Sequence, residues 1–177
     1  MPLVAKDPVL DLIVSKATDG GHRAEYADRV WPCAVGRAGI GLKRGEGDGI
    51  SPRGAWPIRR VLYRADRLAA PQTVFAVNPI APDDGWCDAP DHRAYNLPVK
   101  LPFAASHEEM WRADGLYDIV VVLGHNDAPV VPAAGSAVFL HVARPDYGPT
   151  AGCAALARDD LLDFLALAGP ETRLCFC

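Results

Sequence analysis

The sequence lacks any long hydrophobic run. Half of its 177 residues are hydrophobic, yet uninterrupted apolar stretches are no longer than segments such as Ile119–Leu123. A membrane-spanning helix needs roughly 20 apolar residues, so we predict no membrane span. The first seven residues, Met1–Asp7, also lack the basic segment and apolar core of a secretory signal, and export is not visible in them.

An excess of basic residues is also missing. Lys and Arg total 18 against 22 Asp and Glu, which gives a net charge of −4. A protein that binds nucleic acid by neutralising phosphates is expected to have a basic surplus or a concentrated basic face. The densest basic stretch, residues 43–67, is interrupted by Glu46, Asp48 and Asp66. We interpret it as solvated surface and predict no nucleic-acid partner.

Cysteine is scarce, and the common metal and nucleotide motifs are incomplete. His107-Glu-Glu-Met-Trp111 has Trp where the zinc motif H-E-x-x-H needs a second His, and residues 36–41 match neither the dinucleotide fingerprint nor the P-loop. Cys175 and Cys177 would share one face of a terminal strand, where buried thiols are favoured over metal ligation. We predict no metal site. Five cysteines are too few for a disulfide scaffold in a chain of this length, and their odd number leaves at least one thiol without an intrachain partner: Cys33, Cys87, Cys153, Cys175 and Cys177.

Glycine and proline, 16 of each, fall between short apolar runs, a pattern typical of β-rich domains. Strands are predicted at residues 10–15, 24–31, 58–63, 73–78, 117–123, 137–142 and 172–176. Residues 158–168 instead place Leu161, Phe164 and Leu165 on one helical face and end at Gly-Pro. A shorter helix is expected over 106–112. The sequence therefore predicts one mainly β domain over 1–177, a sandwich or barrel with one substantial helix near the C-terminus.

A long proline-rich loop is predicted over residues 79–105. It contains five prolines and the aromatic residues Trp86, Tyr95 and Phe103, with little periodicity. Loops of this length are usually functional or disordered, and the aromatic residues favour an ordered loop. Aromatic rings in a small β domain more often belong to the core than to a binding groove.

One region combines the residues of a nucleophilic site. A predicted strand delivers His141, a Pro/Gly loop follows, and Cys153 comes 12 positions later after Gly152. A thiol attacks as thiolate, so it needs an imidazole to take its proton and backbone amides for the resulting oxyanion. Gly152 permits a sharp turn that aims its own amide and that of Cys153 at this charge, and Thr150 is placed to orient the loop. The alternative is a buried structural cysteine with a histidine bonded to a backbone carbonyl.

Several ordered motifs resemble the L,D-transpeptidase catalytic domain of the YkuD type. The order of His141, a loop and Pro-Thr-Ala-Gly-Cys153 is similar to that family's His, loop and Ser/Thr-x-Gly-Cys. The segment Lys43-Arg-Gly-Glu-Gly-Asp-Gly-Ile-Ser-Pro-Arg-Gly54 resembles the family's Glu-Gly-Asp-Gly-x-Thr-Pro-x-Gly segment, and its Glu-Gly-Asp-Gly run predicts a hairpin turn. Asp84–Asp88, Tyr95-Asn96 and Gly135–His141 resemble segments of one bacterial branch. The likeness covers about residues 33–176.

This resemblance implies a mostly β enzyme that acts on peptidoglycan stem peptides in the periplasm or cell envelope. Cys153 would form an acyl-enzyme with a tetrapeptide stem, release D-Ala, and pass the acyl group to an amine of a neighbouring stem. It also implies that carbapenem β-lactams acylate the cysteine and that no cofactor is needed. Two alternatives stay open: an L,D-carboxypeptidase or peptidoglycan hydrolase that uses the same acyl-enzyme, and a non-catalytic module that binds the cell wall.

The sequence departs from the family pattern around the nucleophile. The family usually has His immediately before the Gly-Cys pair and Arg or Asn two residues after the Cys. This sequence has Ala151 and Ala155 at those two positions. We expect Arg144 to replace that Arg or Asn by binding a stem carboxylate, with a solvated surface Arg as the equal alternative. His125 is a candidate to polarise His141, although a turn cap is favoured.

Asn96 is the last candidate for substrate contact. It follows Tyr95 in the proline-rich loop. A side-chain amide in such a loop either reaches the substrate or holds the loop in place, and the second interpretation is the safer one.

Overall fold

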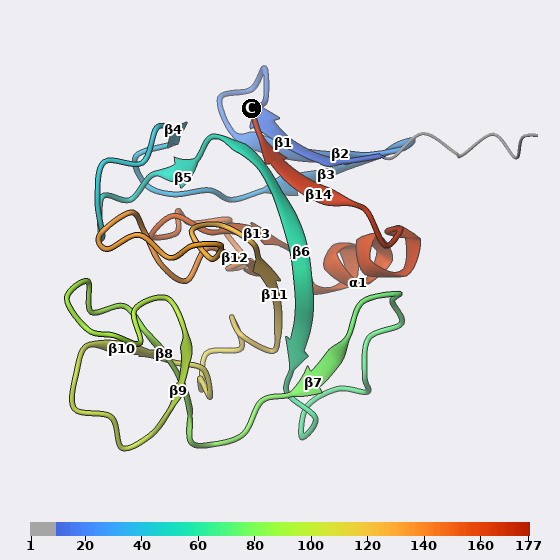
Figure 1. The fold of residues 1–177 in the computed structure, drawn as a ribbon. Helices are drawn as coiled ribbons and strands as arrows, with labels where there is room; N and C mark the ends of the chain where they lie inside the picture. Colours follow the sequence, from blue (N-terminus) through green and yellow to red (C-terminus); the bar gives the residue numbers. More distant parts are fainter. Residues whose placement is uncertain (1–9) are drawn as a thin grey trace, which may run out of the picture.

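A computed structural model describes residues 10–177 (Figure 1). Most of the regular structure is β-strand. In chain order the elements are β1 (Leu12–Lys16), β2 (His22–Tyr26), β3 (Arg29–Cys33), β4 (Ile40–Gly41), β5 (Ser51–Pro52), β6 (Gly54–Tyr63), β7 (Val77–Pro79), β8 (Asp84–Cys87), β9 (Pro98–Lys100), β10 (His107–Glu109), β11 (Ile119–Leu123), β12 (Phe139–Val142), β13 (Ala154–Leu156), α1 (Arg158–Leu167) and β14 (Arg173–Phe176).

The main sheet is nearly closed into a barrel. Its strands follow the order β13-β12-β11-β6-β14-β1-β2-β3, and β7 pairs with β6. The two ends of this order meet just beyond β3, where Ala34 and Ala155 exchange two backbone hydrogen bonds of 2.9 Å. The prediction of a mainly β, barrel-like fold is confirmed.

Strands β11 and β12 separate two hydrophobic cores. Because successive side chains of a strand point to opposite faces, Val121 and Leu140 face the barrel interior while Val120 and Phe139 face the other side. All five residues of β11 are buried, since both of its faces are covered. This explains why the run Ile119–Leu123 is continuously apolar rather than alternating.

Helix α1 packs against the barrel interior near β2 and β3. It buries Leu161, Phe164 and Leu165, as the predicted helical face requires, and the Phe164 ring meets the Tyr26 ring edge-on at 5.3 Å. The helix ends at Leu167, one residue before the predicted end. No helix among residues 10–177 is long and apolar enough to cross a membrane.

The strand prediction over 24–31 is wrong in one respect. The chain reverses at Ala27, which has a φ of 53°, so two antiparallel strands, β2 and β3, replace one long strand. A two-residue hairpin needs this left-handed conformation, and Ala-Asp is a weak signal for it compared with Asn-Gly. The strand predicted over 73–78 is also displaced, because regular pairing begins only at Val77.

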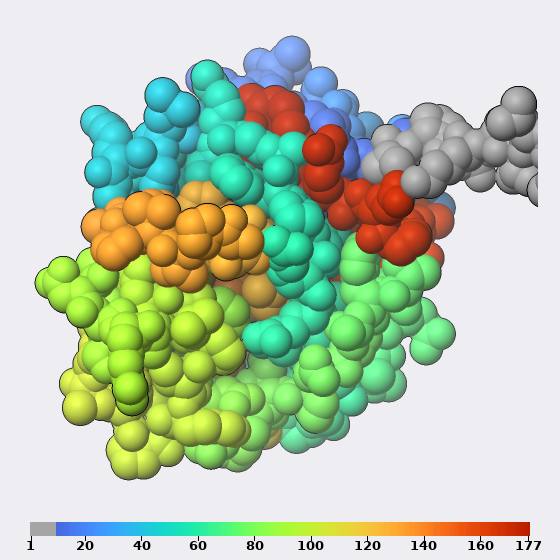
Figure 2. Space-filling model, in the orientation of Figure 1, coloured from blue at the N-terminus to red at the C-terminus, as the bar shows by residue number. Residues whose placement is uncertain are grey.

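The proline-rich segment is not a plain loop. It contains β8, β9 and most of the connection to β10. Together β8, β9 and β10 form a separate three-stranded sheet in the order β10-β8-β9, which we call the β8–β10 lobe. The helix predicted over 106–112 is wrong, because His107–Glu109 pairs antiparallel with β8 instead. This tertiary pairing outweighs the local helix preference. Figure 2 shows this lobe, in yellow-green, beside the orange segment that leads into β12.

Candidate active site

His141 lies in β12, and Cys153 immediately precedes β13, the parallel neighbour of β12. His141 lies in β12 and pairs with Ala155 of β13, and Cys153 comes two residues before Ala155. Side chains two apart on an extended chain share a face, so the thiol and the imidazole project from the same side of the sheet. That side is the outer face of the barrel wall, where Cys153 packs in the second core beneath the β8–β10 lobe.

The Cys153 thiol is neutral in this structure. Its side chain is buried, Sγ donates to the Ala137 carbonyl at 3.2 Å, and the Phe139 amide donates to Sγ at 3.4 Å. Burial, followed by the nearby Glu108 carboxylate, raises the pKa of Cys153 to about 12. The thiol therefore gives its hydrogen bond to a backbone carbonyl rather than to the imidazole. The thiolate that nucleophilic attack requires is therefore not the form that this structure favours.

His141 is held as a neutral base. Its Nδ1 lies 2.9 Å from the Val142 carbonyl oxygen, which can only accept, so Nδ1 carries the proton and Nε2 keeps its lone pair. Burial lowers the pKa of His141 to about 4, so the ring is uncharged at neutral pH. The Tyr117 ring meets the imidazole edge-on at 5.3 Å and fixes its plane. This tautomer is the one that can remove a proton from a thiol.

Both side chains line one cleft of about 200 Å³ on the outer face of the barrel. Thr150 and Arg144 line it as well, so the structure brings together four of the seven predicted site residues. The complete lining is Glu108, Arg112, Leu116, Tyr117, His141, Arg144, Gly148, Pro149, Thr150, Ala151, Cys153 and Ala155.

The loop before the cysteine is held by Thr150. Its hydroxyl donates to the Cys153 carbonyl at 2.7 Å and accepts from the Gly152 amide at 3.1 Å. The Gly152 amide is therefore occupied and is not aimed at an oxyanion in this conformation. Among residues 10–177, no oxygen accepts a hydrogen bond from the Cys153 amide, which leaves this donor for a developing negative charge.

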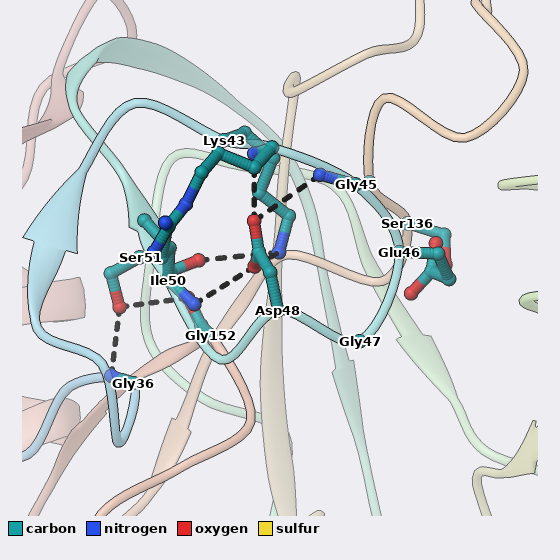
Figure 3. Close-up of polar contacts among 12 residues, drawn as sticks. Gly36, Lys43, Gly45, Glu46, Gly47, Asp48, Ile50, Ser51, Ser136 and Gly152 are labelled. Atoms are coloured by element: carbon teal, nitrogen blue, oxygen red, sulfur yellow. Dashed lines mark hydrogen bonds and ion pairs between the residues drawn. The ribbon is translucent and has the colours of Figure 1, made fainter.

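Ser51 supports the same loop from below (Figure 3). Its fully buried hydroxyl donates to the Gly152 carbonyl at 2.9 Å and accepts from the Gly36 amide at 2.9 Å. Gly152 has a φ of +147°, a region that disfavours side chains, and a Cβ there would lie 3.0 Å from the Ile50 carbonyl oxygen. Glycine is therefore required next to the nucleophile by both backbone conformation and space.

The Glu-Gly-Asp-Gly run forms the other part of this support. Asp48 accepts hydrogen bonds from Lys43 Nζ at 2.6 Å and from the Arg44 and Ile50 amides (Figure 3). Burial alone would raise the pKa of Asp48, but these donors outweigh it and lower the pKa to about 2. The predicted hairpin is wrong, because the flanking strands β4 and β5 pair in parallel. The run is instead a loop wound around one carboxylate.

Arg144 lies at the exposed edge of the site. It lines the cleft that holds Cys153 and also an adjoining cleft lined by Asp114, Asp118 and Asp159. Among the described residues its guanidinium is within 4 Å of no carboxylate, so it is available to a ligand. Its role in substrate binding stays a prediction.

Asn96 and His125 lie outside the cleft. The Asn96 side chain accepts from Trp86 Nε1 and the Ala137 amide at 3.0 Å and donates to two backbone carbonyls, so it anchors the lobe to the segment before β12. The His125 ring packs edge-on against Trp56 at 4.7 Å, and burial lowers its pKa to about 4. Neither side chain is brought to Cys153.

Three polar residues of the cleft were not among the predicted site residues: Glu108, Arg112 and Tyr117. Glu108 accepts a hydrogen bond from the Tyr117 hydroxyl, and Arg112 lies with its guanidinium carbon 5.1 Å from the centre of the Tyr117 ring. Glu108 belongs to the His-Glu-Glu sequence that fails as a zinc motif. Its place in the site depends on β10, and nothing in the local sequence predicts that strand.

The other cysteines lie away from the cleft. Cys33 and Cys87 are buried, whereas Cys175 is half-buried and Cys177 is exposed, with their sulfurs 3.0 Å apart. The expectation of buried thiols at both terminal positions is therefore wrong for Cys177. Among residues 10–177, no three His, Cys, Asp or Glu side chains cluster so that they could hold a metal ion.

Comparison with known proteins places this arrangement in a family. Residues 15–174 match the sequence profile described as "YkuD: L,D-transpeptidase catalytic domain". Among solved structures, L,D-transpeptidase 1 of Mycobacterium tuberculosis is similar at 12% identity and a TM-score of 0.41, over 95% of this chain and 61% of that one. An L,D-transpeptidase from Mycobacterium smegmatis is similar at 13% identity and a TM-score of 0.40, over 95% and 59%.

This chain thus spans about three fifths of the length of either mycobacterial chain. No curated protein matches it significantly. The profile match extends from β1 to β14 and includes both cleft-lining strands and the Glu-Gly-Asp-Gly loop. By that match, the chain belongs to the L,D-transpeptidase (YkuD) catalytic domain family, which cross-links peptidoglycan.

Proposed function

We propose that this protein is a cysteine L,D-transpeptidase that joins peptidoglycan stem peptides. The observation that carries the proposal is the shared cleft of Cys153 and His141, in which a neutral thiol faces the same space as an imidazole with Nε2 free to accept a proton. The family match supports the substrate class, a peptidoglycan stem peptide, and we expect the donor stem to end in D-Ala. No other described cysteine lines this cleft.

In the first half-reaction the donor stem enters the cleft. Rotation of the Cys153 side chain away from the Ala137 carbonyl brings Sγ toward His141 Nε2, which takes the thiol proton. The sulfur then bonds to the carbonyl carbon of the third stem residue, and the Cys153 amide stabilises the oxyanion. The protonated imidazole returns its proton to the leaving amine, and D-Ala departs.

The second half-reaction transfers the acyl group. An amine of a neighbouring stem attacks the thioester carbon, the carbon–sulfur bond breaks, and the sulfur recovers a proton through His141. A thioester divides one difficult amide exchange into two easier steps. The proposed chemistry uses protein groups alone, and we expect Arg144, which lines the cleft, to bind a stem carboxylate bidentately.

Covalent labelling tests the nucleophile. Incubation with a carbapenem followed by intact mass measurement is expected to add one inhibitor mass to the wild type and none to Cys153→Ala. A wild-type protein with no adduct, or a Cys153→Ala protein with the same adduct, would show that Cys153 is not the acylated residue.

The remaining cysteines provide the controls. Changing any one of Cys33, Cys87, Cys175 and Cys177 to Ser is expected to leave labelling intact, although Cys33 and Cys87 are buried and their replacement costs stability. A folded Cys87→Ser protein that no longer labels would contradict the assignment.

Product analysis separates transfer from the alternatives. With purified disaccharide-tetrapeptide as substrate, mass spectrometry is expected to show cross-linked dimers. Trimmed monomers alone would indicate an L,D-carboxypeptidase or hydrolase that uses the same acyl-enzyme, and unchanged substrate would indicate a wall-binding module. Because the substrate is peptidoglycan, we place the protein in the periplasm or cell envelope, which fractionation of the full-length product tests.

A further inference from the structure

Glu108 is an acidic residue inside the cleft that the proposed mechanism does not use. It is the middle residue of β10 and lines the cleft together with Cys153 and His141. The next residue, Glu109, points to the opposite face of the strand and is exposed. Strand β10 therefore has one glutamate in the cleft of Cys153 and one exposed to solvent.

The Glu108 carboxylate has a hydrogen-bond donor but no ion-pair partner, and the charge of Arg112 acts on it only from a longer distance. The Tyr117 hydroxyl donates to its Oε2, and the Tyr117 ring also contacts the imidazole of His141. The guanidinium of Arg112 is instead held by Asp114, at 3.0 and 2.5 Å. Among residues 10–177, no Lys, Arg or His nitrogen lies within 4 Å of Glu108. A largely buried carboxylate without an ion-pair partner is costly.

This charge opposes the first half-reaction. Burial raises the pKa of Glu108, and the Glu108 carboxylate is the second largest cause, after burial, of the raised pKa of Cys153. A negative charge beside a nucleophile that must become a thiolate slows acylation. An arriving cation would give the unpaired carboxylate an ion-pair partner. The chemical group on a stem peptide that fits is a primary ammonium.

We propose that Glu108 binds the ammonium group of the acceptor stem and thereby favours amide transfer over hydrolysis of the acyl-enzyme. This inference rests on the proposed function, because an acceptor is needed only if Cys153 forms the acyl-enzyme. A carboxylate beside the thioester orients an amine within reach of the acyl carbon, and water gains no comparable contact.

The proton balance is complete without an added reactant. The acceptor ammonium loses one proton to the Glu108 carboxylate and becomes a neutral amine. The amine nitrogen bonds to the acyl carbon, the carbon–sulfur bond breaks, and the second surplus proton passes through His141 to the Cys153 sulfur. Glu108 then returns its proton to solvent, so one amide and one thiol are formed and one proton is released.

Separate donor and acceptor peptides test the inference. The donor is a stem tetrapeptide with every amine acetylated, which can acylate the enzyme but cannot accept. The acceptor is a stem tripeptide with free amines. In the wild type, the ratio of cross-linked to hydrolysed product is expected to rise with acceptor concentration. In Glu108→Gln that ratio is expected to fall about 10-fold, the usual effect of losing one charged contact. Acylation by the acetylated donor is expected to be faster, because the opposing charge is gone.

Several outcomes would overturn the inference. A ratio in Glu108→Gln within 2-fold of the wild type contradicts it. If a donor with free amines acylates the wild type faster than the acetylated donor, and Glu108→Gln removes only that advantage, the carboxylate binds the donor ammonium instead. A wild type that forms no acyl-enzyme refutes the proposed function itself, which is a distinct result.

Glu109→Gln is the matched control, since it removes the same charge from the exposed face of the same strand and is expected to leave the ratio unchanged. Acylation by the acetylated donor reports that each variant is folded. If Glu108→Gln does not acylate, Glu108→Asp is measured in its place, with a smaller fall in the ratio expected. An unchanged ratio in Glu108→Asp would then contradict the inference.

Discussion

At the scale of single residues, the site depends on backbone groups as much as on side chains. Thr150 and Ser51 both bond to the loop that carries Cys153, and Gly152 occupies a conformation that other residues rarely adopt. The Cys153 thiol itself rests between the Ala137 carbonyl and the Phe139 amide. Main-chain hydrogen bonds therefore position the reactive sulfur. The surrounding side chains act indirectly, by holding the main chain in the conformation that makes these bonds.

Gly152→Ala tests this requirement. We expect acylation at least 10-fold slower and a loss of about 1–3 kcal/mol of unfolding free energy, because the new Cβ is both strained and in close contact with the Ile50 carbonyl. Urea unfolding and the rate of carbapenem labelling measure the two effects.

Gly20→Ala serves as the control. Gly20 also has a positive φ, +93°, but no atom lies within 4 Å of a Cβ built there. Its strain is expected to cost about 1 kcal/mol with no change in labelling. Equal labelling rates in Gly152→Ala and wild type would show that the loop conformation is unimportant for attack.

At the scale of elements, two parts of the chain far apart in sequence together form and support the loop that carries Cys153. Strand β5 supplies Ser51 and the β4–β5 connection supplies the Lys43–Asp48 pair, while the segment between β12 and β13 supplies the nucleophile. The barrel closure at Ala34 and Ala155 fixes these parts against each other. The β8–β10 lobe then covers the outer face and adds Glu108.

Ser51→Ala is expected to destabilise the loop that carries Cys153. Removing the hydroxyl leaves the Gly36 amide unpaired and the Gly152 carbonyl without its 2.9 Å hydrogen bond in a fully buried place, which costs about 1–3 kcal/mol. Labelling of Cys153 is expected to slow at the same time. Stability comes from denaturant unfolding, and the labelling rate from intact mass.

Ser136→Ala is the comparison for this variant. The Ser136 hydroxyl donates to Glu46 at 2.8 Å in the same region of the molecule, but it is exposed and bonds to no part of the cysteine loop. If Ser51→Ala and Ser136→Ala had the same stability and the same labelling rate, Ser51 would not be needed to hold the cysteine loop.

At the scale of the whole molecule, two histidines are buried in neutral form. Burial lowers the pKa of both His125 and His141 to about 4, below the usual value of 6.5. Between these values the unfolded chain binds protons that the folded protein does not, so stability is present at neutral pH and falls as pH decreases from about 6.5 toward 4.

The expected loss between pH 7 and pH 5.5 is about 1 kcal/mol for each histidine. Urea unfolding at the two pH values measures it in the wild type and in His125→Phe, which keeps an aromatic ring beside Trp56 but cannot titrate. The variant is expected to lose the share of His125, about 1 kcal/mol of the change between the two pH values. An identical pH dependence in the two proteins would mean that His125 titrates freely in the folded state.

The sequence by itself determined the β-rich class, helix α1 and the pair of Cys153 and His141. These features follow from local signals: short apolar runs between Gly and Pro, one helical face at 158–168, and the spacing of a few motifs. Such signals can be recognised without knowing which residues pack against them. For Asn96 the sequence offered substrate contact or loop anchoring and favoured anchoring, which its contacts in the structure confirm.

Only the tertiary structure decided which other residues share the cleft. Strand β10 exists because it pairs with β8, and its own residues favoured a helix, so Glu108 could not be placed at the nucleophile from the sequence. The protonation of the thiol and the imidazole also depends on burial and on neighbours from distant strands. These properties arise from groups that meet in space, and a linear pattern does not contain that information.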